Sequence, residues 1–191
     1  KRDPFTVLKT QNRYYQSFWC NDTLAIVSDY WWNNRNQKTY LFNPSNPSKE
    51  PLVISDRNYQ DRYSDPGDFV EERNRYGEYV LLLRNKNLFL IGDGFSANGQ
   101  FPFLDELKTS TLKKKRIYES SIEGQKESLR DFNPDDKNLF VRIESPNEYP
   151  NYFFRNLDGE LNQITYFVNP FKSIQNVHKE VIKYKREDGL D

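Results

Sequence analysis

The chain has 191 residues, enough for one domain with a substantial core, and its 28 Lys and Arg balance its 28 Asp and Glu. A net charge of zero argues against nucleic acid or an anionic membrane as partner, and no apolar run reaches the roughly 18 residues of a membrane-spanning segment. Tyr and Phe occur 13 and 14 times, and this aromatic-rich composition favours strands.

The first predicted unit lies near residues 14–55. It combines an alternating strand, a tight turn at Asn21-Asp22, an unbroken apolar strand and two further strands. The four strands are predicted at Tyr14–Cys20, Leu24–Ser28, Lys38–Asn43 and Pro51–Ser55.

Two further units of four short strands follow near residues 79–119 and 127–167. The middle unit is predicted from "EYVLLLR", "NLFLIGDGF", "QFPFLDELK" and "KKKRIYES". The last unit is predicted from "KESLRDF", "LFVRIES", "NYFFRNL" and "LNQITYF", with a turn in "NPDDKN". A final strand is predicted at Val177–Tyr184, followed by a turn at Glu187-Asp188-Gly189.

Four antiparallel strands that recur about every 40–50 residues are typical of β-propeller blades. The apolar runs "LAIV" and "LFLI" fit inner strands that neighbouring blades cover on both faces. The predicted fold is therefore all-β, an incomplete β-propeller of about three four-stranded antiparallel blades, with a sandwich or barrel as the alternative. Three blades are too few to close a ring, so we expect self-association through open faces at Leu24–Val27 and Leu88–Ile91.

Four stretches give the sequence a more specific character: "SDRNYQDRYSDPGDF", "GDGFSANGQFPFLDEL", "VRIESPNEYPNYFFRNL" and "NPFKSIQNVHKEVIKYKREDGLD". Together they resemble the propeller region of bacterial prolyl oligopeptidase family serine peptidases, most of all the glutamyl endopeptidase-like and acylaminoacyl-peptidase-like members. The resemblance implies a partial propeller at residues 1–167. It also implies that residues 168–191 are the linker and first strand of an α/β-hydrolase domain that the chain itself lacks.

The catalytic triad of that family cannot be placed on this chain. No Gly-x-Ser-x-Gly occurs, and the only histidine, His178, lies in the predicted linker. Cys20 is interpreted as a small buried hydrophobe in "SFWC" rather than as a nucleophile. Asp135-Asp136 is interpreted as a turn, since it lacks the spacing of a calcium loop. The sequence thus predicts no catalytic residue, no metal site and no cofactor, and we expect the chain alone to be inactive.

Candidate binding residues come from a topological argument. In a four-stranded blade, the loops between second and third strands and the connections between blades lie on one face, and the linker is expected to leave from this face as well. The loops are 29–38, 56–68, 93–100 and 144–150. Their candidate substrate-binding or interdomain residues are Trp31, Trp32, Arg35, Arg57, Tyr59, Arg62, Tyr63 and Phe95, with Glu148 in the fourth loop.

Two functions remain open at this point. The first is a non-catalytic propeller portion of a serine peptidase that gates and positions peptide substrates, with the α/β-hydrolase domain of the same parent chain and the peptide as partners. The alternative is a stand-alone propeller module that binds protein or glycan ligands. The chain begins at Lys1 and is expected to be a trimmed piece, so the sequence leaves both cytoplasmic and periplasmic localisation open.

Overall fold

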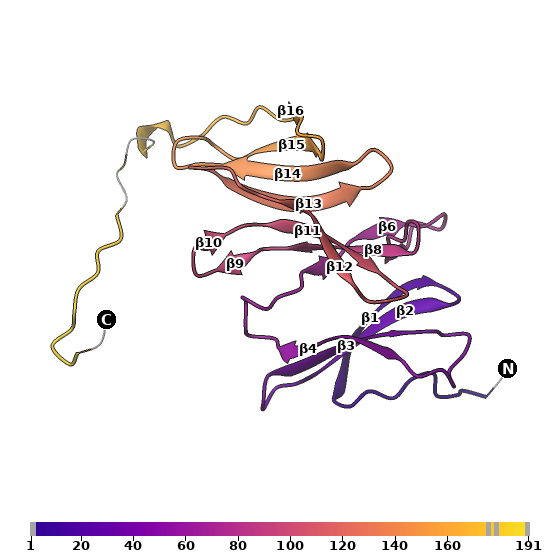
Figure 1. The fold of residues 1–191 in the computed structure, drawn as a ribbon. Helices are drawn as coiled ribbons and strands as arrows, with labels where there is room; N and C mark the ends of the chain where they lie inside the picture. Colours follow the sequence, from indigo (N-terminus) through magenta and orange to yellow (C-terminus); the bar gives the residue numbers. More distant parts are fainter. Residues whose placement is uncertain (1–2, 175–176, 178–179, 190–191) are drawn as a thin grey trace.

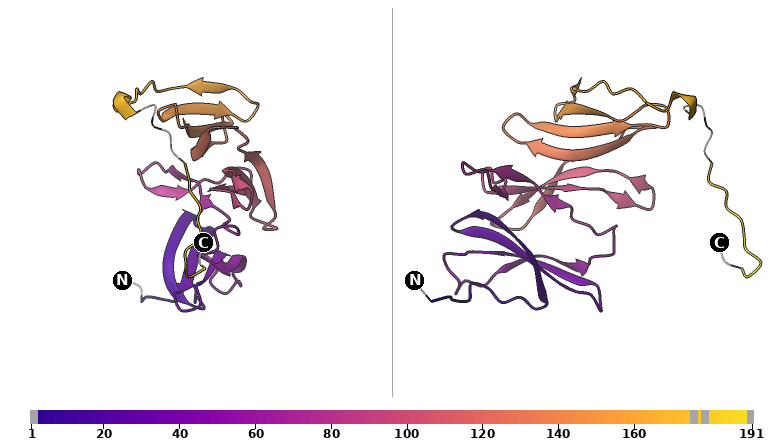
Figure 2. Two further views of the ribbon diagram at one scale, coloured as in Figure 1. Left: turned by 90° about the vertical axis from the view of Figure 1, so that its left-hand side faces the viewer. Right: turned by 180° about the vertical axis from the view of Figure 1, so that it is seen from behind.

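The computed structural model describes residues 3–174, 177 and 180–189, and this part of the chain is built from strands (Figure 1). Three four-stranded antiparallel sheets follow one another side by side, each a meander in chain order, and they do not close a ring (Figures 1 and 2). The prediction of an all-β fold with three four-stranded antiparallel blades is confirmed. None of the described helical segments has the length or apolarity needed to span a bilayer.

The first blade has the strand order β1-β2-β3-β4. Its strands are β1 (Arg13–Asn21), β2 (Leu24–Trp31), β3 (Asn36–Phe42) and β4 (Leu52–Asn58). The predicted strands are present, but β2 and β3 extend further toward each other than expected. The predicted loop 29–38 therefore shrinks to a turn of four residues, 32–35.

The second blade has the order β12-β11-β8-β5. Its strands are β5 (Asp68–Phe69), β8 (Asn87–Gly92), β11 (Phe103–Lys108) and β12 (Lys114–Glu119). A small hairpin of β9 (Phe95–Ser96) and β10 (Gly99–Gln100) projects from the connection between β8 and β11.

The prediction that "EYVLLLR" forms a strand of the second blade is wrong. Instead, β7 (Tyr79–Leu81) pairs with β6 (Glu71–Arg73) in a separate two-stranded sheet. The edge of the blade is taken by β5, because Gly67, with φ of 86°, lets the chain turn in close against β8; a Cβ there would lie 2.5 Å from the backbone oxygen of Ile91.

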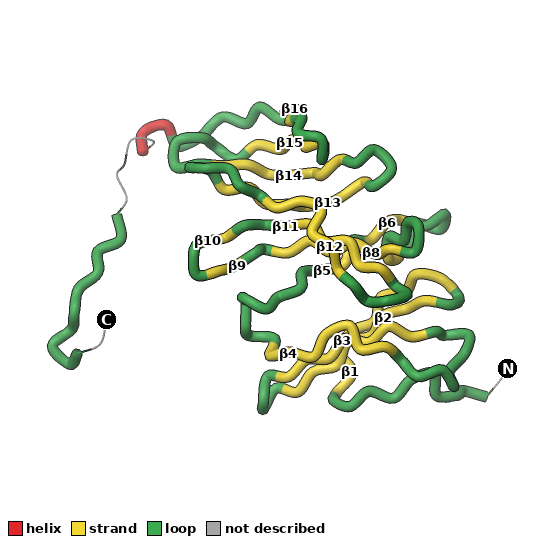
Figure 3. Tube along the Cα trace, in the orientation of Figure 1, coloured by secondary structure: helices red, strands yellow, loops and turns green. Residues whose placement is uncertain are grey.

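The third blade has the order β13-β14-β15-β16. Its strands are β13 (Lys126–Asn133), β14 (Asn138–Glu144), β15 (Asn151–Asn156) and β16 (Leu161–Gln163). After it come the short 3₁₀ helix η1 (Lys172–Ile174) and an extended segment without strands in its described residues (Figure 3). The strand predicted at Val177–Tyr184 is thus wrong at Val177 and residues 180–184, because no strand within the described residues pairs with this segment; residues 178–179 lie outside the described part. The turn predicted at Glu187-Asp188-Gly189 is present.

Apolar side chains join successive blades. Between the first and second blades, Leu24 and Ile26 of β2 pack with Leu88 and Leu90 of β8. Between the second and third blades, the core comprises Val70, Leu82, Phe89, Leu104, Leu129, Phe132, Leu139, Val141 and Ile143. Alternate residues of β8 therefore face opposite neighbours, which explains its continuous apolar run.

The open apolar face is not where the sequence predicted it. Leu24–Val27 is buried, with the residues of β2 that face away from the second blade covered by Val7 and Leu8 of the N-terminal segment, and Leu88–Ile91 lies in the middle blade. In the described part of the chain, the outer face of the third blade is exposed: there Phe140 packs between Tyr152 and Phe154, and Phe154 is 46% exposed. The prediction overlooked that the N-terminal segment could cover the first blade.

Candidate functional site: a polar cavity between the first two blades

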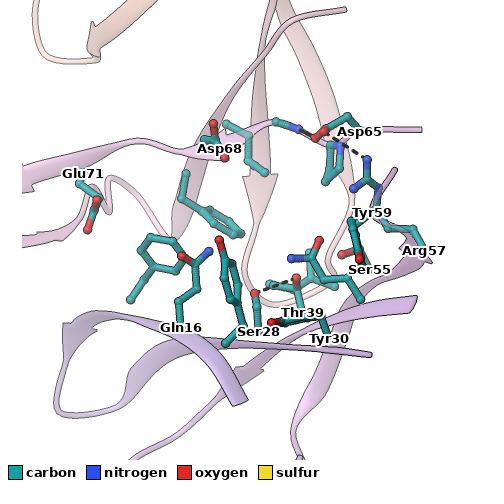
Figure 4. Close-up of a pocket in the computed structure, with 18 residues that line it drawn as sticks. Gln16, Ser28, Tyr30, Thr39, Ser55, Arg57, Tyr59, Asp65, Asp68 and Glu71 are labelled. Carbon is teal, nitrogen blue, oxygen red and sulfur yellow. Dashed lines mark hydrogen bonds and ion pairs between the residues drawn. The ribbon is translucent and has the colours of Figure 1, made fainter. Parts of the chain in front are cut away.

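A cavity of about 610 Å³ lies between the first blade and the chain that enters the second (Figure 4). Its floor comes from residues that alternate along β2. Leu24 and Ile26 pack against the second blade, whereas Ser28 and Tyr30, on the same face, line the cavity. The change from apolar to polar side chains along one strand thus leaves this end of the interface hollow.

Three tyrosines form an aromatic wall. The rings of Tyr15 and Tyr30 meet edge to face at 5.3 Å between centroids, and those of Tyr30 and Tyr59 do so at 6.0 Å. At the floor, the hydroxyls of Ser28 and Thr39 are 3.1 Å apart and bond to each other. The cavity therefore offers aromatic surface together with polar groups, a combination typical of ligand sites.

Arg57 lies at one side of the cavity with its side chain 10% exposed. Its Nη2 donates to the backbone oxygen of Asp61 at 2.8 Å and pairs with Oδ2 of Asp65 at 3.2 Å. Among the described residues, Nε of Arg57 is the buried side-chain nitrogen or oxygen that has no hydrogen-bond partner. A buried donor without an acceptor lowers the stability of the fold.

Carboxylates dominate the charge of the cavity. Asp65, Asp68 and Glu71 line it, against the single guanidinium of Arg57. Partial desolvation raises the pKa of the Asp68 carboxyl, and the charges of Asp65 and Asp93 raise it further. Figure 4 shows Arg57, Asp65 and Tyr59 gathered on one side of the cavity, Glu71 on the other, and Asp68 between them.

The two tryptophans do not join this cavity. Trp31 ends β2, rather than lying in a loop, and the guanidinium of Arg13 lies 5.3 Å from its ring. Trp32 is exposed in the turn beside Arg35, whose Nη1 donates to the backbone oxygen of Trp32. Trp31 and Trp32 thus lie beside different arginines, Arg13 and Arg35.

Arg62 forms a second group with Phe95. Its guanidinium lies 3.7 Å from the centre of the Phe95 ring and 3.7 Å from Oδ2 of Asp93, and its side chain is 64% exposed. Tyr63 is exposed and lines, with Phe95, a neighbouring hollow of about 500 Å³. Of the three predicted arginines, Arg62 therefore presents its charge most openly.

These groups lie on one side of the molecule, at one end of the three blades. We call this side the near side, and it comprises residues 32–35, 59–67, 93–102 and 145–150. The backbone N–H of Tyr59 donates to the oxygen of Arg35 at 2.9 Å, which joins the first two segments. The chain leaves β16 on the side of the β9–β10 hairpin (Figures 1 and 2). Glu148 stands apart from the arginines and accepts from Gln125 at 2.6 Å.

The sequence analysis missed Tyr15, Asp65, Asp68 and Glu71 as cavity residues. A signal existed in "SDPGDF", where Pro and Gly mark a close turn that brings two carboxylates against the first blade. Tyr15 could not be found this way, because its place depends on which face of β1 meets the second blade.

Two residues with nucleophilic or basic chemistry lie away from the cavity. Cys20 is half-buried, and burial, followed by the charge of Glu72, raises the pKa of its thiol. A raised pKa lowers the thiolate fraction and disfavours a nucleophilic role. His178 lies outside the described residues. Within residues 3–174, 177 and 180–189, no three His, Cys, Asp or Glu side chains are grouped closely enough to hold a metal ion.

Comparison with known proteins gives one consistent set of relatives. No protein family model matches the chain. It is 32% identical over 204 residues to a protein of Arabidopsis thaliana named "Probable glutamyl endopeptidase, chloroplastic", and 29% identical over 202 residues to a protein of the same name from Oryza sativa subsp. japonica. Each match covers 98% of this chain but only 21% and 22% of the relative, so the chain spans about a fifth of the length of these curated relatives.

Among solved structures, TolB from Acinetobacter baumannii aligns with 86% of this chain and 35% of its own, at 17% identity and a TM-score of 0.44. The chain is therefore similar over nearly its whole length to part of two proteins named as glutamyl endopeptidases.

Proposed function

We propose that this chain is the non-catalytic propeller portion of a serine peptidase of the prolyl oligopeptidase family, and that its near side gates and positions peptide substrates for an α/β-hydrolase domain. The observation that carries the proposal is the similarity over 98% of the chain to about a fifth of each glutamyl endopeptidase. A sequence with no Gly-x-Ser-x-Gly fits a supporting portion rather than the catalytic one.

Arg62 is the near-side residue best placed to meet an acidic peptide. Its guanidinium is exposed, and the ring of Phe95 beneath it restrains its orientation. Asp93, itself 67% exposed, can yield to a peptide carboxylate in the same position. Arg57, by contrast, is already engaged by Asp61 and Asp65.

The test uses the full-length protein that the gene encodes. Arg62→Ala is expected to lower kcat/KM for peptides with acidic side chains about tenfold, through loss of one charge-assisted hydrogen bond, with little effect on neutral peptides. Lys115→Ala is the control, because Lys115 lies on β12 of the second blade, near the hollow beside Phe95, but, unlike Lys114, does not line it. Equal kinetics for wild type and Arg62→Ala would remove the substrate role from Arg62.

Catalytic dependence on another domain gives a second test. The chain alone should not react with a fluorophosphonate probe, whereas the full-length protein should be labelled at one serine. Labelling of the chain would contradict the proposal. A full-length protein without a Gly-x-Ser-x-Gly serine would favour instead the stand-alone module that binds protein or glycan ligands.

A further inference from the structure

A second group of charged and aromatic side chains lies at the end of β2, outside the cavity. The guanidinium of Arg13 lies 5.3 Å from the ring centre of Trp31, and that of Arg35 lies 5.9 Å from the ring centre of Trp32. The two pairs are neighbours, because Trp31 is the last residue of β2 and Trp32 begins the turn 32–35. We call these four residues the tryptophan surface.

The acidic residues of the neighbouring strands do not neutralise the two arginines. Asp29 of β2 is fully buried. Asp56 of β4 pairs with Lys38 at 3.1 Å, and hydrogen bonds from Asn36 and Lys38 lower the pKa of its carboxyl. Within the described residues, neither guanidinium of the tryptophan surface is paired with a carboxylate. This end of the first blade therefore carries positive charge that its own acidic residues leave unpaired.

Contact with an aromatic ring leaves the hydrogen-bonding capacity of a guanidinium largely unused. Its five N–H donors lie around the rim of the planar group, and a ring offers them no acceptor oxygen. Nη1 of Arg35 donates to the backbone oxygen of Trp32, whereas the exposed guanidinium of Arg13 makes no hydrogen bond to a described residue. Arg13 can therefore bind a carboxylate through two parallel N–H···O bonds.

A hollow of about 320 Å³ adjoins this guanidinium. It is lined by Gln11, Asn12, Arg13 and Trp31. Asn12 is held in place, since its Nδ2 donates to Asp29 at 3.1 Å and to Asn36 at 3.0 Å. Its Oδ1 accepts no hydrogen bond from a described residue and is not buried. A peptide N–H can donate to this oxygen, whereas a phosphodiester backbone has no such donor.

We propose that the tryptophan surface binds an acidic segment of another polypeptide, with one carboxylate at Arg13 and a neighbouring carboxylate at Arg35. The composition fits this role, because arginine and tryptophan are enriched among the residues that dominate the binding energy of protein interfaces. The inference goes beyond the proposed function, since this binding needs no hydrolase domain and does not involve Arg62.

The experiment is a fluorescence titration of the full chain. Two of the three tryptophans of the chain belong to the tryptophan surface, and Trp19→Phe removes the signal of the third. The probes are acetyl-hexaglutamate amide and the neutral acetyl-hexaglutamine amide. We expect the acidic peptide to bind about tenfold more tightly, the equivalent of two exposed charge contacts. Raising the salt to about 0.5 M should reduce this difference, because screening weakens exposed ion pairs.

Neutral variants locate the site. Arg13→Gln and Arg35→Gln should each weaken binding of the acidic peptide about three- to fivefold. Arg75→Gln is the matched control, because the guanidinium of Arg75 also lies beside an aromatic ring, 4.7 Å from the centre of Tyr76, but in the turn between β6 and β7. Arg62→Ala should leave binding unchanged as well, which separates this surface from the proposed substrate contact. Far-UV circular dichroism checks that each variant is folded.

Four results would overturn the proposal. The first two are equal binding of the two peptides and unchanged binding in both Arg13→Gln and Arg35→Gln. The third is an equal loss of binding in Arg75→Gln, which would reduce the effect to general surface charge. The fourth is tighter binding of a single-stranded oligothymidylate than of the acidic peptide, which would assign the surface to nucleic acid. Loss of binding in Arg62→Ala alone would also contradict it, and would support the proposed function instead.

Discussion

The two interfaces between successive blades differ in how completely their buried arginines are paired. Between the second and third blades, Glu127 is fully buried and Arg155 is 13% exposed; Nε of Arg155 donates to Oε1 of Glu127 at 2.7 Å, and the hydroxyl of Tyr118 donates to Oε2 at 2.5 Å. Between the first and second blades, Arg57 instead faces a cavity with its Nε unpartnered.

The difference lies in how completely the buried charged groups are paired. In the second interface each buried charge has partners within the blades, so the network locks two blades together, and burial and the bond to Glu127 raise the pKa of the Tyr118 hydroxyl. In the first interface Arg57 pairs with Asp65, but its buried Nε has no acceptor. Among the described residues, Nε of Arg57 is the unsatisfied buried side-chain atom, so the first interface is the less completely paired of the two.

The largest effect is expected from breaking the complete network. Arg155→Met leaves the Glu127 carboxylate buried without its cation, and we expect a loss of about 3–5 kcal/mol in the free energy of unfolding, measured by urea denaturation. Arg142→Met is the control, because Arg142 pairs with Glu144 at 2.9 Å where both side chains are about a quarter exposed, and its loss should stay below about 1 kcal/mol. Equal losses in the free energy of unfolding for the two variants would show that burial does not increase the contribution of the ion pair to stability.

Replacing Arg57 of the first interface should reduce the free energy of unfolding less than replacing Arg155. Arg57→Met removes the ion pair with Asp65, but Asp65 is 49% exposed and can be hydrated, and the unpartnered Nε disappears with the side chain. We expect a loss below about 1.5 kcal/mol in the same denaturation experiment. A loss as large as that of Arg155→Met would mean that Arg57 is a structural residue and would end the contrast between the interfaces.

The uncovered third blade offers a comparison with both covered interfaces. Phe154 is 46% exposed and lies 5.8 Å from Phe140 on the outer face. Phe154→Lys should weaken self-association of the chain about tenfold, seen as a shift in the concentration dependence of sedimentation. Tyr76→Lys, an exposed aromatic in the turn between β6 and β7, should not. A wild-type chain that stays monomeric at all concentrations contradicts this prediction.

The smallest effect concerns Asp68 and pH. A raised pKa means that ionisation of Asp68 is less favourable in the folded than in the unfolded chain, so its contribution to stability is present at low pH and is lost as pH rises through the folded pKa. Asp68→Asn should therefore be slightly more stable than wild type at pH 7, by less than about 0.5 kcal/mol after solvent screening, and equal at pH 3. Thermal melts at both pH values, with Asp158→Asn as reference, test the sign; a variant less stable at pH 7 would contradict it.

Local patterns in the sequence were sufficient to predict most strands and to predict which loops lie on the near side. Apolar runs and turns placed the strands of the first and third blades, because their hydrogen bonds join neighbours in the chain. The alternation of up and down strands then grouped Arg57, Tyr59, Arg62 and Phe95 at one end of the molecule. That step needed only the count of strands and no knowledge of packing.

Tertiary structure alone decided the rest. β5 displaced "EYVLLLR" from the second blade because Gly67 allows a close approach to Ile91, a contact between residues far apart in the chain. The cavity lies where Ser28 and Tyr30 of one blade meet the segment 65–71 that enters the next, and the sequence does not show that these segments lie together. Hydrogen bonds between neighbouring strands can be read locally, whereas the partners of side chains between blades depend on how whole sheets pack.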